Sequence, residues 1–113
     1  MVFEFKRKKV TVEAYGNSYE IPTKTVAFAD ELAAAQKRIN EAKTTHEETV
    51  AVLDGIAKLF IGEVETNRIF PREKINEIDV DELAAFWLEL KNASNVATQE
   101  VIKKYSPNTA IRK

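Results

Sequence analysis

The residues that could carry chemistry in this chain are few and stand apart. His46 is the only histidine and cysteine is absent, so neither a two-histidine metal site nor a thiolate nucleophile can be built. Asp79, Asp81 and Glu82 are close enough in sequence to suggest a cation site. Calcium loops, however, need more oxygen ligands and a central glycine. Acidic residues also satisfy the free N–H groups at a helix start, so we interpret this cluster as a helix cap.

No other pattern indicates catalysis or a cofactor. The three glycines, Gly16, Gly55 and Gly62, are too dispersed to form a phosphate-binding loop. Glu47 and Glu48 are adjacent carboxylates, but nothing in their context distinguishes a glycosidase-type pair. We therefore predict a non-enzymatic protein with no cofactor and no metal.

The composition is that of one globular domain. The chain has 113 residues, of which 44% are hydrophobic and 31% are charged. Its 17 basic and 18 acidic residues give a net charge of -1, which argues against a general binder of nucleic acid or anionic membranes. No apolar run is long enough to span a bilayer, and the first residues lack the apolar core of a secretory signal. We expect a cytoplasmic protein.

Two basic stretches leave alternatives open. The run Lys6–Lys9 lies between apolar residues and could contact an anion or a nucleic acid. It could equally form a charged turn that keeps an edge strand from aggregating, and we favour this interpretation. The end of the chain, from Lys103 to Lys113, contains four basic residues and no acidic residue. We expect residues 105–113 to form a flexible tail, although a basic arm that binds a partner would have the same composition.

The first 22 residues have the pattern of strands. Residues 10–14 alternate between apolar and polar side chains, as a half-buried strand does. A two-residue turn at Gly16–Asn17 would supply the positive φ angles of a tight hairpin. That turn pairs residue 14 with residue 19 and residue 12 with residue 21, so that four side chains share one face: Val12, Ala14, Tyr19 and Ile21. The same register places Glu13 opposite Glu20, a pair of like charges.

A second short strand pattern, Val2–Phe5, precedes this hairpin. The β segment is thus predicted to be a hairpin or a small meander. A unit of this size is not stable alone in water, so its apolar face must pack on helices.

Two helices are predicted to follow the β segment. The first spans about Thr25 to Lys43, and its apolar stripe consists of Phe28, Leu32, Ala35, Ile39 and Ala42. Thr45 and Glu48 form a capping box for the second helix. Its stripe consists of Val50, Leu53, Ile56, Ala57, Phe60, Ile61 and Val64. Gly55 would permit a close helix crossing, and Gly62 would permit a bend.

The last third of the chain contains the strongest packing pattern. Pro71–Ile78 is expected to form one or two short turns. A long helix then runs from Asp79 to Lys104, and Asp79 and Glu82 form its capping box. Its apolar stripe is Val80, Leu83, Trp87, Leu90, Ser94, Ala97 and Val101. We predict an α+β fold that is mainly α, a single domain of residues 1–113 with a β segment (1–22) and a helical body (25–104) of three main helices.

The apolar stripe of the last helix is broad, and more than one packing partner is compatible with it. Phe86 and Ala93 widen it beyond a coiled-coil seam, which favours packing inside a domain. Ser94 and Ala97 are small enough to let another helix approach closely. That helix could belong to the same chain or to a second copy.

The order of these parts resembles small tail-assembly proteins of long-tailed phages and prophages of Gram-positive bacteria. The resemblance rests on a short β segment (Val10–Ile21), a helical body, a Phe-Pro junction (Phe70–Pro71) and the acidic-capped helix Ile78–Leu90. It covers most of the chain, although its motifs are packing and capping motifs. It implies a tail-assembly chaperone, which binds the helical tape-measure protein, self-associates, and has neither enzymatic activity nor a cofactor.

The resemblance also implies how a partner would be bound. An exposed apolar face would cover an amphipathic partner helix. The aromatic cluster of the last helix offers candidate anchors, namely Phe86, Trp87 and Leu90. Burial of all three in the core of the chain is the competing interpretation, and it applies less to Phe86, at the flank of the stripe. An oligomeric interaction module outside any phage, or a nucleic-acid-binding protein, remains an alternative.

Overall fold

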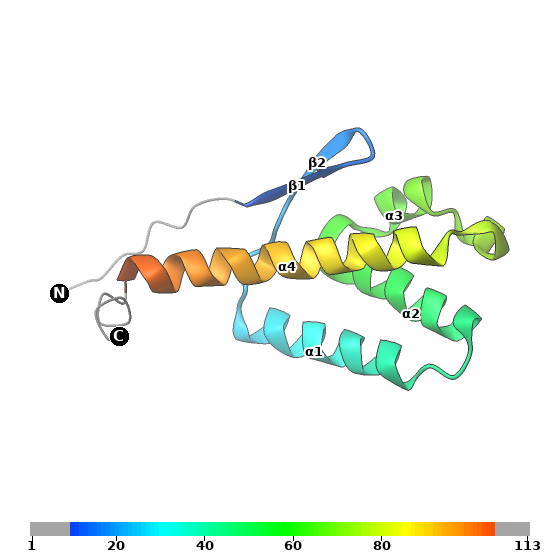
Figure 1. Ribbon diagram of the computed structural model, residues 1–113, viewed down its shortest axis with the longest axis horizontal. Helices are drawn as coiled ribbons and strands as arrows, with labels where there is room; N and C mark the ends of the chain where they lie inside the picture. Colours follow the sequence, from blue (N-terminus) through cyan, green and yellow to red (C-terminus); the bar gives the residue numbers. More distant parts are fainter. Residues whose placement is uncertain (1–9, 106–113) are drawn as a thin grey trace.

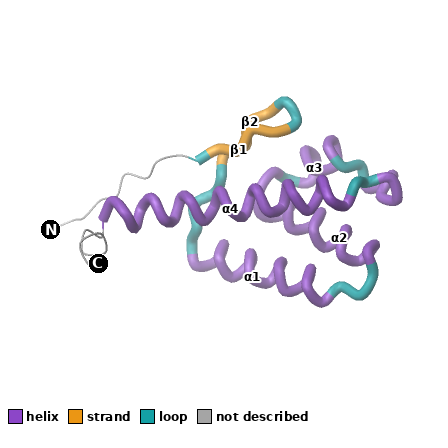
Figure 2. Tube along the Cα trace, viewed as in Figure 1, coloured by secondary structure: helices purple, strands orange, loops and turns teal. Residues whose placement is uncertain are grey.

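A computed structural model describes residues 10–105, and describes side chains for residues 10–95. Its elements are β1 (Thr11–Ala14), β2 (Asn17–Glu20), α1 (Val26–Glu41), α2 (Thr45–Ile56), the π-helical turn η1 (Ala57–Ile61), α3 (Glu63–Ile69), the 3-10 helix η2 (Arg72–Glu77) and α4 (Val80–Tyr105). The predicted α+β class, mainly α with a hairpin on the helices, is confirmed (Figure 2). The predicted strand Val2–Phe5, the run Lys6–Lys9 and residues 106–113 lie outside the described residues.

The hairpin forms, but its register differs from the predicted one. Strands β1 and β2 pair antiparallel with Val12 opposite Tyr19 and Ala14 opposite Asn17. The turn is therefore Tyr15–Gly16, one residue earlier than predicted. Because each partner shifts by two residues, the same side chains still share the inner face. The shift also removes the predicted pairing of Glu13 with Glu20, since Glu13 now lies opposite Ser18.

Tyr15 takes the left-handed conformation that we expected of Asn17. Its φ is 54° and that of Gly16 is 80°, the two positive angles of a tight hairpin turn. A tyrosine in this region costs about 1–2 kcal/mol. The Tyr15 ring offsets this cost, because it packs edge-on against Phe86 at 5.2 Å and against Phe70 at 5.8 Å. The turn is thus fixed by contacts distant in sequence, which local turn preferences do not reveal.

Helices α1 and α2 are antiparallel neighbours joined by a short loop (Figure 1). The α1 N-cap is Thr25, whose Oγ1 accepts a hydrogen bond from the backbone N–H of Phe28 at 3.0 Å. The α2 N-cap is Thr44, which accepts from the N–H of Glu47 at 3.0 Å, so the predicted cap at Thr45 is wrong by one residue. The Glu47 side chain also bonds back toward the start of the helix. Its Oε1 accepts a hydrogen bond from the backbone N–H of Lys43, the residue before the cap. The arrangement resembles a capping box placed one residue earlier than predicted, except that the return bond comes from the residue before the cap rather than from the cap itself.

The apolar stripe predicted after α2 is interrupted. At η1 the N–H of Gly62 donates to the carbonyl of Ala57, five residues earlier, which is the bond of a π turn. Gly62 then adopts a φ of 90° and ends the helix, so the predicted bend is confirmed. The extra residue in the π turn and the end of the helix at Gly62 change the direction of the side chains on α3 relative to those on α2. Val64, predicted to belong to the stripe, is consequently 87% exposed on α3.

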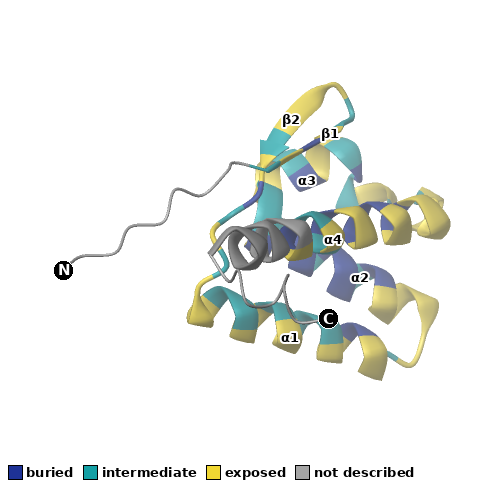
Figure 3. Cartoon of the chain, turned by 60° about the vertical axis from the view of Figure 1, so that its left-hand side comes forward, coloured by how far each residue is buried: buried dark blue, intermediate teal, exposed yellow. Residues whose placement is uncertain are grey.

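Helix α4 runs through the middle of the molecule, with the hairpin on one side and the α1–α2 pair on the other (Figures 1 and 3). Its inner face meets α2 and β1 in one core, formed by Val12, Ile21, Ile39, Ala51, Val52, Leu53, Ile56, Leu59, Phe70, Leu83, Phe86, Trp87 and Leu90. Between α3 and α4 the chain turns at Pro71–Ile78, where the short turns that we predicted are found. Within residues 10–105, no helix combines the length and the apolar character needed to cross a membrane.

Candidate functional site

The three side chains that we expected to anchor a partner lie in the core. Phe86 and Trp87 are each 5% exposed, and Leu90 is fully buried. Phe86 is the clearest difference, because we placed it at the exposed flank of the stripe. The hairpin covers that flank: the Phe86 ring contacts the rings of Tyr15 and Tyr19. In this conformation none of the three is available to a partner.

Trp87 has its polar atom satisfied within the chain. Its indole N–H donates to the side-chain oxygen of Gln36 on α1, at 3.1 Å. Lys91 donates to the same oxygen and lies 5.7 Å from the centre of the indole ring. A Cβ at Gly55 would lie 3.0 Å from the Trp87 ring, so the glycine permits a close helix crossing, as we predicted, and the crossing helix is α4. Trp87 thus joins α1, α2 and α4.

A polar cluster holds the hairpin to α3. The Glu65 carboxylate accepts hydrogen bonds from Arg68 at 2.6 Å, from the Tyr19 hydroxyl and from the Asn17 amide at 2.8 Å. These donors, Arg68 first, hold the pKa of Glu65 at about 2. Arg68 also donates to the backbone carbonyl of Tyr15 at 3.1 Å. These bonds join β2 and the turn of the hairpin to α3, so we interpret the cluster as a clamp on the hairpin.

The acidic cluster at the start of α4 is a cap, as we interpreted it. One carboxylate oxygen of Asp79 accepts from the N–H groups of Asp81 at 3.0 Å and Glu82 at 3.1 Å. Glu82 completes no capping box; it accepts from the Tyr15 hydroxyl at 2.9 Å. Burial, followed by the hydrogen bond to Glu82, raises the pKa of Tyr15 to about 12. Among the described residues no group of three or more His, Asp or Glu side chains could hold a metal ion.

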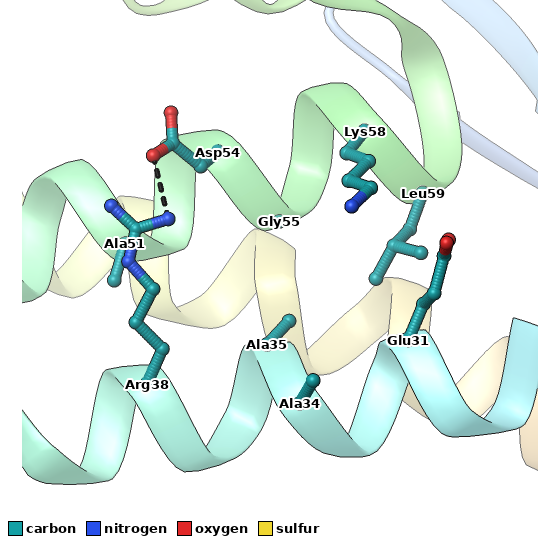
Figure 4. Close-up of a pocket in the computed structure, with 9 residues that line it drawn as sticks. All are labelled: Glu31, Ala34, Ala35, Arg38, Ala51, Asp54, Gly55, Lys58 and Leu59. Atoms are coloured by element: carbon teal, nitrogen blue, oxygen red, sulfur yellow. Dashed lines mark ion pairs between the residues drawn. The ribbon is translucent and has the colours of Figure 1, made fainter.

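A furrow between α1 and α2 is the strongest candidate for a binding site (Figure 4). Its first hollow, of about 170 Å³, is lined from both helices and from η1 by Glu31, Ala34, Ala35, Arg38, Ala51, Asp54, Gly55, Lys58 and Leu59. A second hollow, of about 380 Å³, continues toward the α1–α2 loop and shares Arg38 and Ala51 with the first. It is completed by Glu41, Ala42, His46, Glu47 and Val50. We call the two hollows together the furrow.

The furrow has an apolar floor and charged rims. Ala34, Ala35 and Gly55 leave the floor open because none of them has a side chain longer than a methyl group (Figure 4). Arg38 of α1 and Asp54 of α2 form an ion pair of 2.8 Å that bridges the two walls. Both partners are partly exposed, so this ion pair contributes little stability. Asp54 also pairs with Arg72, at 2.8 Å.

At the other end of the first hollow the charges are not bridged. Glu31 and Lys58 approach the furrow from opposite walls (Figure 4). Neither forms an ion pair with another described residue within 4.0 Å. Four carboxylates and two cations line the furrow, which gives it a net charge of -2. The arrangement suits an amphipathic segment whose apolar side enters the floor and whose charges meet the rims.

Comparisons of the chain with protein-family models, curated proteins and solved structures found no match.

The furrow could not be predicted from the patterns of the separate helices, in which Ala35 belongs to a core stripe and Gly55 to a possible crossing point. The signal that could have revealed it is the succession of small residues on facing helices, Ala34 and Ala35 on α1 and Ala51 and Gly55 on α2. His46 is exposed at the second position of α2 and lines the outer hollow.

Proposed function

We propose that this protein is a non-enzymatic assembly protein that binds an amphipathic helix of a protein partner in the furrow. The observation that supports the proposal is the furrow itself, an open apolar floor bordered by charges of both signs. A partner helix would lie along α1 and α2, with small or medium apolar side chains on the floor. Such contacts recognise a class of helices and require no reacting group.

We further propose that the partner is the tape-measure protein of a phage or prophage tail, so that the protein acts as a tail-assembly chaperone. This part rests on the resemblance in the order of elements, from the β segment through Phe70–Pro71 to the acidic-capped helix. A long helical protein exposes many amphipathic turns before the tail tube surrounds it. A small helical protein that covers these turns would prevent their aggregation.

Gene position and co-expression test the proposal. The gene is expected between those of a major tail protein and a very long, helix-rich protein. Co-expression with that long protein should increase its soluble fraction and yield a stable complex. A gene outside any phage cluster, or a tape-measure protein whose solubility is unchanged, would contradict the chaperone function.

A pair of variants tests the site. Ala34→Arg places a long charged side chain on the furrow floor, whereas Ala33→Arg places it on an exposed position of α1 that does not line the furrow. We expect Ala34→Arg to abolish the complex with the tape-measure protein and Ala33→Arg to leave it intact. Equal behaviour of the two variants would exclude the furrow as the binding site.

A further inference from the structure

Charge is segregated along this chain. Residues 10–95, the part whose side chains are described, contain 16 acidic and 9 basic residues, a net charge of -7. Residues 96–113 contain four basic residues and one acidic residue, a net charge of +3. Residues 1–9 also carry a net charge of +3, so the total of -1 combines an acidic body with a basic segment at each end of the sequence. Two such regions attract each other when they belong to different molecules.

Helix α4 carries the start of the C-terminal basic segment away from the body. It has 26 residues, and its last turns extend past α1 and past the hairpin (Figure 1). The ten residues 96–105 correspond to about 15 Å of helix. Because they continue a straight helix that leads away from the α1–α2 pair, they cannot reach the furrow of their own chain.

The furrow matches this segment in length and in charge. Along α1 its lining residues run from Glu31 to Glu41, which is also about 15 Å of helix. Its net charge is -2, whereas residues 96–105 carry a net charge of +1, from Lys103, Lys104 and Glu100. Its floor consists of small apolar residues, and the sequence of residues 96–105 alternates apolar and polar residues at helical spacing, with Ala97 and Val101 four positions apart.

We propose that the C-terminal turns of α4 in one copy, residues 96–105, occupy the furrow of a second copy. The contact joins two different surfaces, so it is heterologous and leaves a free furrow and a free α4 end on the resulting pair. Addition of further copies then gives a ring if the rotation closes and a filament if it does not. The furrow is the site proposed above for a partner helix, so the partner would compete with the second copy.

A charge exchange in the full-length protein tests this contact. The variant Glu31→Lys/Glu41→Lys reverses the furrow rim, and the variant Lys103→Glu/Lys104→Glu reverses the helix end. Each alone should raise the concentration needed for self-association by about tenfold or more, because like charges then face each other. Mixed in equal amounts, the two variants should associate again with alternating copies. The acidic helix end of one fits the basic furrow of the other, and the unmodified basic helix end of the latter fits the unmodified acidic furrow of the former. Light scattering and sedimentation measure both results.

A matched control separates the furrow from net charge. Asp30→Lys/Glu89→Lys makes the same change of four charge units at exposed positions that do not line the furrow, and it should self-associate like the unmodified protein. A monomeric unmodified protein at millimolar concentration would overturn the proposal. So would self-association of the furrow variant at the unmodified strength, or a mixture that stays monomeric. Binding of a DNA or RNA oligonucleotide that Lys103→Glu/Lys104→Glu abolishes, without any self-association, would assign the basic segment to nucleic acid instead.

These measurements need no tape-measure protein, so their failure would leave the chaperone function standing. Conversely, a protein that fails to bind the tape-measure protein can still show the charge exchange. The two proposals are therefore tested separately, although they share the furrow.

Discussion

At the scale of single residues, Gly55 is a position where α2 packs closely on α4. A Cβ there would lie 3.0 Å from two atoms of the Trp87 ring, and Trp87 is held in place by Gln36. We predict that Gly55→Val lowers the free energy of unfolding by about 2 kcal/mol, because the added side chain overpacks the crossing. Urea denaturation measures this change. Ala85→Val, on the exposed face of α4, is the control and should cost about 0.5 kcal/mol through helix propensity. Equal losses in the two variants would contradict the tight crossing.

Glu65 gives a prediction for acid conditions. Its hydrogen bonds hold its pKa at about 2 in the folded protein, below the ordinary value of 4.5. A carboxylate with a lowered pKa stabilises the folded state above its ordinary pKa, and this stabilisation is lost as the pH falls toward about 2. In Glu65→Gln that part of the acid dependence should be absent, and unfolding midpoints measured between pH 5 and 2 should vary less. A variant that retains the full acid dependence would show that Glu65 is not the group responsible.

At the scale of elements, the two neighbouring threonines before α2 distinguish the observed cap from the predicted one. Thr44 accepts the N–H of Glu47, whereas the Thr45 hydroxyl makes no cap hydrogen bond. Thr44→Ala should therefore lower the free energy of unfolding by about 1 kcal/mol. Thr45→Ala, at the first helical position, should change it by a few tenths of a kcal/mol at most. A larger loss of stability in Thr45→Ala than in Thr44→Ala would show instead that Thr45 is the N-cap.

The sequence predicts the helices, strands and turns better than the contacts between them. The apolar stripe of α1, the hairpin, the bend at Gly62 and the short turns before α4 are local patterns, and all are found. The α4 stripe is found from Leu83 to Ser94, but Val80 is 45% exposed, and Ala97 and Val101 lie outside the residues whose side chains are described. Val64 is misplaced because a π turn adds a residue that no period of 3.6 anticipates. The exposure of Phe86 is misjudged because the hairpin covers it, a contact between segments about seventy residues apart. The furrow could not be predicted for the same reason, since it is formed only by the contact of two helices.

At the scale of the whole molecule, stability should be distributed unevenly. Of the 16 residues of α1 only Ile39 is buried, whereas α2 buries six of its 12 residues. Helix α1 packs mainly on α2 and η1, while α2 also contacts α4. The core of the molecule is thus α2 with α4, and α1, which forms one wall of the furrow, is the more weakly attached layer.

This difference predicts the order in which backbone amides exchange with deuterated solvent. We expect α1 to exchange through a local opening at a lower free energy than α2 and the first half of α4, because few apolar side chains must be exposed to detach it. Hydrogen exchange measured by mass spectrometry separates the two helices. Ile39→Ala should speed exchange in α1 more than in α2, whereas Leu53→Ala should speed both, since Leu53 is fully buried in the common core. Uniform exchange across α1 and α2 would instead show one cooperative unit. Occupation of the furrow, by a second copy or by a partner helix, ties both walls together and should therefore slow exchange in α1 in particular.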